Sequence, residues 1–360
     1  MKKILSLLIP VAAILSCTED GTEDAAEVYV PKSPFTLSVD RQEIESDGKQ
    51  AAVFSITDAE GLDLTENSEL MSKIYFKNEA TGRRLTKRTK EFRSVEDGEF
   101  TFSATVSGEA CANTVKVVSS GRSKYEVFTK NVAVYRFTAT WCQNCPSMTQ
   151  GLEKVSDWTK NRMVELALHG SGSTYAYSDG SKYVADYLYP RFDAPGYPSC
   201  VYDLDYMSDT RTYSEIEAII FDRIADSPAT CGIKASSSFS AGVVSVSANI
   251  KSSTGGKYDI GFAILRNDCV PGGSAYEKEY DNVVVALSGN YEYMSAGAFD
   301  LQKDEESAAS ESSVNLTVPS DAKIEDYSVV VYALKQDGSD VDIDNIVRFP
   351  IGESVEYIYN

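Results

Sequence analysis

The chain has 360 residues, and its 54 acidic side chains outnumber the 34 basic ones, so the formal net charge at pH 7 is −20. A chain this acidic does not favour nucleic acid or anionic lipid surfaces, and we expect no nucleic-acid partner. Its single histidine, His169, excludes metal sites built from several histidines and argues against a Ser-His-Asp hydrolase. We expect His169 to end a strand rather than to take part in chemistry.

Residues 1–16 read as a secretory signal peptide, with a basic start, a short apolar stretch and a small residue before the cut. The apolar stretch is too short to cross a bilayer as a stable helix. The segment Ile14-Leu15-Ser16-Cys17 resembles a bacterial lipobox, which implies cleavage before Cys17 and diacylation of that cysteine. The bilayer would then be a partner through acylated Cys17. The alternative is an ordinary signal peptide with an incidental cysteine.

Residues 17–32 are polar and acidic at their start, which predicts a disordered tether. Acidic residues directly after a lipidated cysteine resemble the surface-export signal of Bacteroidota lipoproteins, although a plain spacer would look the same. We therefore expect an outer-membrane lipoprotein that faces the periplasm or the cell surface.

Residues 33–130 consist of short alternating runs between Gly and Asp turns, a pattern typical of a β-sandwich. The basic stretch Arg83–Lys90 reads as the solvated face of a hairpin. Cys111 reads as a small buried residue or a loop thiol.

Residues 131–228 change character and predict an α/β domain. A continuous apolar strand over 131–138 precedes a helix that carries Met148, Leu152, Val155 and Trp158 on one face, and a second strand covers 163–168. This order favours a βαβ unit with parallel strands. Further elements are expected as a tyrosine-rich helix over 181–189 that Pro190 stops, a strand over 199–202, and a helix that starts at Ser214 with a capping box to Glu217.

Residues 229–360 return to β patterning with six expected strands, enough for a second β-sandwich. The loop 337–345 carries Asp340, Asp342 and Asp344. It lacks the glycine and terminal glutamate of an EF-hand loop, so an ordinary acidic hairpin is the favoured interpretation over a calcium site. We expect no metal and no dissociable cofactor.

The motif that carries chemistry is Thr140-Trp141-Cys142-Gln143-Asn144-Cys145-Pro146, between a strand and a helix. A cysteine at a helix N-terminus lies near unpaired N–H groups and the positive end of the helix dipole, which favour the reactive thiolate. We expect Cys142 to be the exposed attacking thiol. We expect Cys145, one turn into the helix, to be buried and to resolve the mixed disulfide. A zinc site would need two further ligands at suitable spacing, and none is evident.

This motif resembles the Trp-Cys-x-x-Cys centre of the thioredoxin superfamily. The later segment Gly196–Asp203 resembles the part of that superfamily that holds a cis-proline. The resemblance implies that Pro198 is cis and lies opposite the disulfide. It also implies that Trp141, Tyr197 and Pro198 bind the substrate, with the Tyr197 backbone pairing with an extended segment.

Two departures from the superfamily pattern concern the chemistry. Arg136 stands where thioredoxins usually carry a buried aspartate, and an arginine cannot serve as a base. If it points inward, it could lower the pKa of either cysteine, with Glu165 as a candidate ion partner. The dipeptide Gln143-Asn144 differs from Gly-Pro and leaves the redox direction open.

The whole chain also resembles a family of Bacteroidota outer-membrane lipoproteins. The resemblance implies a multidomain α+β protein, in which an Ig-like β-sandwich precedes a thioredoxin-like α/β domain and a C-terminal β-sandwich. It rests mainly on the Cys142–Pro146 segment, with weaker support from Leu37–Asp40, Tyr280–Val284 and Phe349–Gly352. Cys231 and Cys269 could form a structural disulfide if they lie close enough, and Cys200 is expected to be a buried thiol.

Two functions from different classes remain open. The first is a membrane-anchored thiol–disulfide oxidoreductase that acts on protein thiols or disulfides and needs an external reductant. The second is a non-enzymatic surface protein, an adhesin or assembly component, in which the Cys142–Cys145 bond is a structural staple. A sugar-binding or sugar-degrading lipoprotein is a third, less supported hypothesis.

Overall fold

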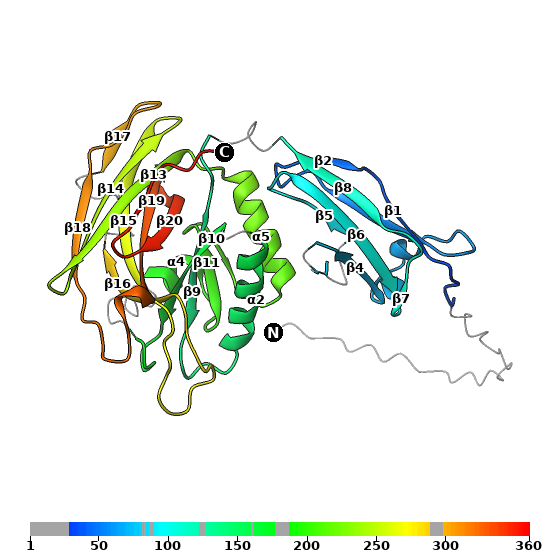
Figure 1. Cartoon of the computed structure of the whole chain (residues 1–360), viewed down its shortest axis with the longest axis horizontal. Helices are drawn as coiled ribbons and strands as arrows, with labels where there is room; N and C mark the ends of the chain where they lie inside the picture. Colours follow the sequence, from blue (N-terminus) through cyan, green and yellow to red (C-terminus); the bar gives the residue numbers. More distant parts are fainter. Residues whose placement is uncertain are drawn as a thin grey trace, which may run out of the picture.

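The computed structural model describes residues 29–80, 82, 84–85, 90–121, 127–159, 162–176, 187–288 and 298–360. The predicted signal peptide, Cys17 and most of the tether lie outside these residues, as do most of the basic stretch and of the tyrosine-rich segment. The described chain is a mainly β protein with few helices and several sheets (Figure 1). No helix within the described ranges is long and apolar enough to span a bilayer.

The first part of the chain is a β-sandwich, as the alternating runs predict. One sheet has the order β1-β3-β5 and the other β2-β8-β6-β4, with β7 beside β6. Aromatic side chains fill the space between the sheets, with the Phe54 ring centroid 5.2 Å from that of Phe76 and 4.8 Å from that of Phe102. The bounds are β1 Thr36–Val39, β2 Glu43–Glu45, β3 Ala52–Thr57, β4 Ile74–Asn78, β5 Glu91–Phe92, β6 Gly98–Val106, β7 Glu109–Ala110 and β8 Val115–Ser120, with short helices η1 Leu64–Glu66 and α1 Ser68–Met71.

A long mixed sheet forms the centre of the rest of the chain. Its order is β12-β11-β9-β10-β16-β15-β19-β20, with β17 beside β15. Strand β10 pairs in parallel with both β9 and β16, and the other pairs are antiparallel. The bounds are β9 Val132–Thr138, β10 Met163–His169, β11 Ser199–Tyr202, β12 Tyr206–Ser208, β15 Gly256–Arg266, β16 Val283–Ser288, β17 Phe299–Leu301, β19 Tyr327–Asp337 and β20 Asp340–Pro350.

Helices α2 (Cys145–Trp158) and α5 (Tyr213–Asp226) cover one face of this sheet (Figure 1). The predicted apolar stripe of α2 is confirmed for Met148, Leu152 and Val155, which are fully buried. The predicted capping box at the start of α5 is wrong. The helix already begins at Tyr213, and its cap, Thr212, makes no side-chain hydrogen bond. A further short helix, α4, covers Tyr189–Phe192 and contains Pro190.

Among the described residues, the opposite face of β9 and β10 is covered by strands of the same sheet and by the short helix α4. The sheet curls, so that buried side chains of β9 and β10 share one core with side chains of β15, β19 and β20. Every residue of β9 and β10 is buried, as expected for parallel strands with both faces covered.

The predicted boundary at residue 229 does not coincide with a boundary between sheets. A second sheet with the order β18-β14-β13-β21 packs on β15, β16 and β19, which gives two layers. However, β16 pairs with β10, so one of these layers continues the sheet that contains β9 and β10. Pairing the outer edge of β10 satisfies backbone groups that a free edge would expose. The bounds of the second sheet are β13 Cys231–Ser240, β14 Val243–Ser252, β18 Ser310–Asn315 and β21 Ser354–Val355; the turn η4 covers Ile324–Asp326.

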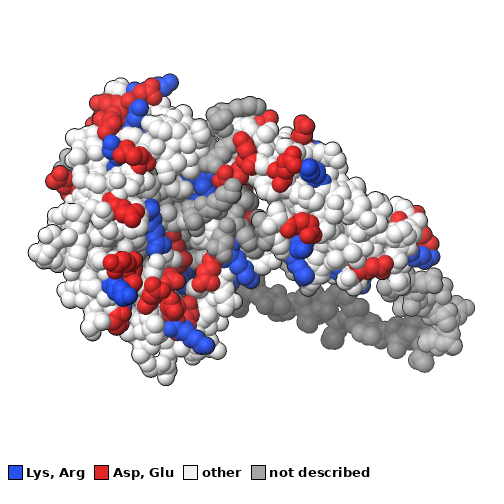
Figure 2. Space-filling model, in the orientation of Figure 1, with Lys and Arg blue, Asp and Glu red and all other residues white. Residues whose placement is uncertain are grey.

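The first sandwich packs against the α5 side of this larger body. Val95 is buried in the core that α2 and α5 form on the sheet, and Lys49 pairs with Asp226 at 3.1 Å. Acidic side chains are spread over both parts of the face in Figure 2 rather than gathered in one patch.

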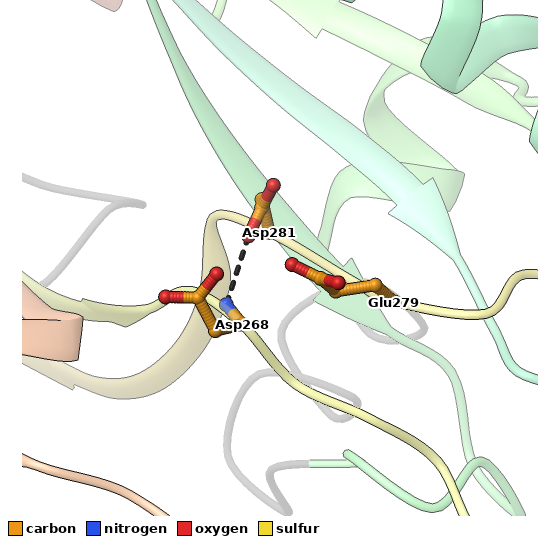
Figure 3. Close-up of side chains that lie close together, drawn as sticks. All are labelled: Asp268, Glu279 and Asp281. Carbon is orange, nitrogen blue, oxygen red and sulfur yellow. Dashed lines mark hydrogen bonds between the residues drawn. The ribbon is translucent and has the colours of Figure 1, made fainter.

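The loop between β15 and β16 covers residues 267–282, and its last residue contacts β10, because the Ala167 N–H donates to the Asn282 carbonyl at 2.8 Å. At its outer end the carboxylates of Asp268, Glu279 and Asp281 lie within 4.8 Å of one another, and the Asp268 N–H donates to Asp281 (Figure 3). All three side chains are exposed, and exposed acidic groups often gather without an ion, so we assign no metal to them.

Candidate redox site

Cys142 and Cys145 form a disulfide in the turn between β9 and α2, with their Cα atoms 5.5 Å apart. The Cys142 N–H donates to the carbonyl of Ala139 at 3.0 Å and thereby closes the turn. Helix α2 begins only at Cys145, with Asn144 as its cap. Cys142 therefore lies at the N-terminus of the helix, just before its first turn, and Cys145 is the first helical residue rather than a residue one turn into the helix.

The disulfide is covered more fully than the sequence predicts. Cys145 is fully buried, as expected, but Cys142 is only 5 % exposed, so the prediction of an exposed attacking sulfur is wrong. The partly buried side chain of Tyr197 packs against the small cluster of Ala139, Cys142 and Cys145. Trp141 remains 47 % exposed; its indole N–H donates to the Ser171 carbonyl at 3.2 Å, and its ring lies 5.3 Å from that of Tyr197.

The bond between Tyr197 and Pro198 is cis, as the resemblance implies. It precedes β11, which pairs with β9 from Ser199 onward, so the sheet itself holds Pro198 near the end of β9. Gly170 makes room for the Tyr197 side chain. A Cβ atom at that glycine would lie 2.5 Å from the tyrosine hydroxyl oxygen.

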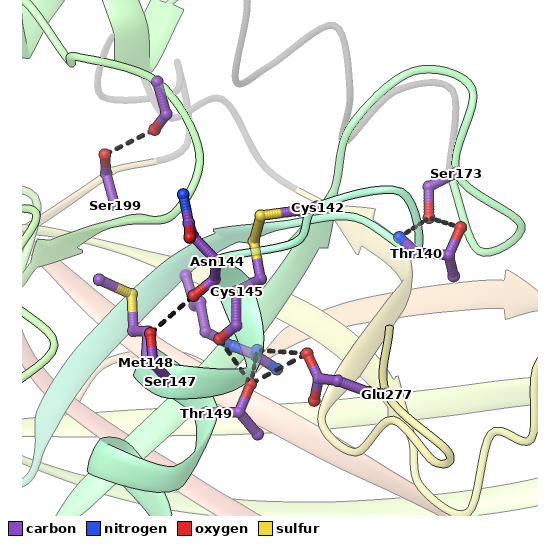
Figure 4. The surroundings of a disulfide bond; sticks show 12 residues. Thr140, Cys142, Asn144, Cys145, Ser147, Met148, Thr149, Ser173, Ser199 and Glu277 are labelled. Atoms are coloured by element: carbon purple, nitrogen blue, oxygen red, sulfur yellow. Dashed lines mark hydrogen bonds and ion pairs between the residues drawn. A yellow bond between two sulfur atoms is a disulfide. The ribbon is translucent and has the colours of Figure 1, made fainter. Parts of the chain in front are cut away.

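Arg136 points inward beneath the disulfide turn. It is 1 % exposed, its Nε forms a short ion pair with Glu165, as the sequence suggests, and its Nη1 donates to the Thr149 hydroxyl. The Thr149 oxygen lies 3.3 Å from the Cys145 carbonyl oxygen and 3.2 Å from a carboxylate oxygen of Glu277 (Figure 4). The Thr149 hydroxyl thus lies between the buried Arg136 guanidinium and the backbone carbonyl of Cys145.

Glu277 is a site residue that sequence reasoning missed. It comes from the β15–β16 loop, more than 130 positions after the cysteines, and its carboxylate lies 4.0 Å from the Arg136 guanidinium. Burial raises the pKa of Glu277, although Arg136 and Thr149 oppose the shift. The loop runs beside the disulfide turn, since the Tyr276 N–H donates to the Thr140 carbonyl at 3.3 Å. No local sequence signal distinguishes Glu277 from the exposed acids of its loop.

His169 ends β10, as predicted, and its role is to hold the neighbouring loop. Its Nδ1 lies 2.8 Å from the Ser173 hydroxyl, which also accepts from the Thr140 N–H at 3.0 Å. Burial, and then the charge of Arg136, lower the pKa of His169 to about 3. The histidine therefore stays neutral beside the buried arginine.

The remaining described cysteines are free thiols. Cys231 and Cys269 do not form the disulfide that the sequence left open, and Cys200 is a buried thiol, as expected. Burial raises the pKa of Cys269 to about 11 and that of Cys111 to about 11, which disfavours reactive thiolates at both positions.

The acidic hairpin at the start of β20 does not present a convergent set of ligands. Asp344 accepts hydrogen bonds from Thr230 and Cys231, while Asp342 pairs with Arg191 at 3.2 Å. These partners support the interpretation of an ordinary hairpin over a calcium site.

The disulfide in a strand-to-helix turn, the α2 and α5 layer on a mixed sheet and the cis bond before Pro198 are together consistent with a thioredoxin-like α/β unit. The chain is similar to HBP35 of Porphyromonas gingivalis, with a TM-score of 0.53 and 16 % identity over 63 % of this chain and 76 % of that one. At this identity the similarity shows the fold alone.

A crystal structure of a protein from Agrobacterium tumefaciens matches 64 % of this chain and 97 % of its own length at 16 % identity. Its TM-score of 0.43 is too low to carry an argument. No family model matches the chain, and no curated protein sequence matches it.

Proposed function

We propose that this protein is a thiol–disulfide oxidoreductase that acts on protein disulfides through Cys142 and Cys145. One observation carries the proposal. The disulfide lies in the turn before a helix, beside the cis bond of Pro198 and the half-exposed ring of Trp141. The helix N-terminus and the buried Arg136 both favour a thiolate at this place.

Written in the reducing direction, the proposed exchange begins with the reduced protein, which donates two electrons to a partner disulfide; the reverse sequence of steps oxidises a partner dithiol. The Cys142 thiolate attacks one partner sulfur, forms a mixed disulfide and releases the other partner sulfur as a thiolate. Cys145 then loses its proton and attacks the Cys142 sulfur, which releases the second partner thiol and closes the Cys142–Cys145 bond. A dithiol reductant restores the reduced pair by the same exchange in reverse.

The proposed setting is the outer membrane, with the chain anchored through an acyl group on Cys17 and facing the periplasm or the cell surface. The lipobox-like segment before Cys17 and the acidic residues after it support this setting. Disulfides persist in such compartments, so the Cys142–Cys145 disulfide would need an external reductant to return to its dithiol form.

One observation favours the second candidate, a structural staple in a non-enzymatic surface protein. Cys142 is only 5 % exposed, and Tyr197 packs against the cluster that it forms with Ala139 and Cys145. Among the described residues the packing side chain is that of Tyr197, beside the half-exposed ring of Trp141, so the disulfide lies close to the surface. We therefore favour the oxidoreductase.

The decisive experiment replaces Cys145 with Ala in the producing cells and searches for mixed disulfides. Without the resolving thiol, exchange stalls with the partner attached to Cys142, and mass spectrometry identifies adducts that a reductant releases. The Cys142→Ala/Cys145→Ala double variant is the matched control and should give none. If the single variant also gives none while its Cys142 reacts with alkylating reagents, the exchange activity is refuted.

A further inference from the structure

A buried charge cluster lies beneath the disulfide, in which one guanidinium faces two carboxylates. The Arg348 guanidinium is connected to one of these, Glu165, through the Asn282 amide. Arg136 of β9 is the centre of the cluster, Glu165 of β10 forms the direct ion pair, and Glu277 of the β15–β16 loop lies 4.0 Å from the Arg136 guanidinium. With both acids ionised the three side chains sum to a net negative charge. With Glu277 neutral the sum is zero.

Glu165 and Glu277 are held differently within this cluster. Glu165 pairs directly with Arg136 and accepts a second hydrogen bond from the Asn282 amide at 3.1 Å. Glu277 instead contacts the neutral hydroxyl of Thr149 at 3.2 Å, and the guanidinium lies beyond hydrogen-bond distance. Glu277 is therefore the more weakly compensated of the two carboxylates, which makes its charge the adjustable part of the cluster.

Thr149 connects this adjustable charge to the redox pair. Its oxygen accepts from Arg136 and lies within hydrogen-bond distance of both the Glu277 carboxylate and the Cys145 carbonyl (Figure 4). A hydroxyl has one proton, so it donates to only one of these two acceptors at a time. The state of Glu277 thus changes both the charge beneath the disulfide and the hydrogen bond to the Cys145 carbonyl.

We propose that Glu277 is a positioning residue that sets the thiol reactivity of Cys142 and Cys145, so that the β15–β16 loop is part of the redox site. This inference rests on the proposed function and adds how that site is regulated. An ionised Glu277 offsets the charge of Arg136 and disfavours the thiolate. A protonated Glu277 leaves Arg136 balanced by Glu165 alone and favours the thiolate.

The other groups that face Glu277 do not supply a competing switch of the same kind. Glu153 of α2 is exposed, so its charge acts through solvent, and the Tyr280 hydroxyl lies 3.3 Å from the Glu277 N–H. His169 of β10 stays neutral, since its pKa is lowered to about 3. Burial raises the pKa of Glu277 above its ordinary value, while Arg136 and then Thr149 lower it.

The test replaces Glu277 with Gln, which removes the charge and keeps the size and the hydrogen-bonding ability. The reduced full-length protein is alkylated with iodoacetamide across a range of pH, and peptide mass spectrometry follows Cys142 separately from the other cysteines. We expect the Glu277→Gln profile to move to lower pH, with alkylation below the thiol pKa faster by about threefold or more, which corresponds to roughly half a pKa unit.

Two further variants make the result specific. Glu277→Asp retains the charge and should keep a profile close to that of the wild type, whereas a purely structural role for Glu277 would disturb both variants. Glu279→Gln removes an exposed acid of the same loop and should leave the profile unchanged. A Glu277→Gln profile that superimposes on the wild type, or an equal shift in Glu279→Gln, would overturn the inference.

This result is independent of the proposed exchange activity, because alkylation of the reduced protein needs no partner. A failed Cys145→Ala trap together with a shifted Glu277→Gln profile would refute the oxidoreductase and leave the electrostatic coupling in place. A successful Cys145→Ala trap together with an unshifted Glu277→Gln profile would support the oxidoreductase and refute the role of Glu277.

Discussion

Two buried charge clusters lie at opposite ends of β9, and they are compensated in different ways. At the start of the strand, the Lys130 ammonium contacts Asp203 at 3.0 Å and donates to the carbonyls of Ile343 and Asp344. At the far end, Arg136 is shared between Glu165 and Glu277. Lys130 has three donors and three partners, whereas Arg136 is surrounded by a surplus of acid.

We infer from this difference that the Lys130 cluster stabilises the fold, whereas the Arg136 cluster affects the reactivity of the disulfide cysteines. Lys130 and Asp203 join the start of β9 to β20 and to the turn after β11, which fixes the curl of the shared sheet. Asp203 is compensated by Lys130 and by Arg223, whose Nε lies 3.5 Å away. The Arg136 cluster has one weakly compensated carboxylate, and it lies directly beneath the only disulfide among the described residues.

The largest effect is expected from breaking the balanced cluster. Lys130→Met leaves the buried Asp203 with only Arg223, whose Nε is 3.5 Å away. Loss of one partner of a buried ion pair typically lowers the free energy of unfolding by about 3–5 kcal/mol, and urea unfolding measures it. The control is Lys49→Met, which removes the exposed pair with Asp226 and should cost at most about 1 kcal/mol. Equal losses in the two variants would contradict the comparison.

The second prediction concerns acid sensitivity at the Arg136 end. The pKa of His169 is about 3 in the folded protein and about 6.5 in an unfolded chain, so the unfolded chain takes up the proton first. Stability should therefore fall as the pH drops below about 6.5, and the loss continues to about pH 3. Between pH 7 and 5 this group costs the wild type up to roughly 2 kcal/mol.

His169→Gln cannot titrate and should lose less stability over that interval. Urea unfolding at pH 7 and pH 5 gives the comparison, and the relevant quantity is the difference between the two proteins at each pH. Parallel losses would show that His169 is not held neutral beside Arg136.

The smallest effect is expected from displacing the Tyr197 side chain, which packs against the disulfide. Gly170→Ala places a Cβ atom 2.5 Å from the present position of the Tyr197 hydroxyl, so the tyrosine has to move away. We expect the alkylation rate of Cys142 in the reduced protein to rise by roughly two- to fivefold as access improves. Gly272→Ala is the matched control, since a Cβ atom at that position contacts nothing within 4 Å. An unchanged rate in Gly170→Ala would mean that Tyr197 does not limit access.

Much of the fold follows from patterns that the sequence carries locally. Alternating runs predict the first sandwich, the continuous apolar segments predict β9 and β10, and the stripe of Met148, Leu152 and Val155 predicts α2. Each of these signals depends on residues a few positions apart. The pairing of β16 with β10, which runs across the predicted boundary at residue 229, could not be predicted in this way because it joins segments more than 100 residues apart.

The sequence by itself determined that a Cys-x-x-Cys pair follows a strand and precedes a helix, and that Tyr197-Pro198 is the matching cis segment. It also carries the lipobox-like segment that predicts a membrane anchor at Cys17. Only the tertiary structure decided that Cys142 lies beneath Tyr197 and that Glu277 reaches the buried Arg136. Motifs and periodicity are properties of neighbouring residues. Burial and charge compensation depend on which distant segments the folded sheet brings into contact.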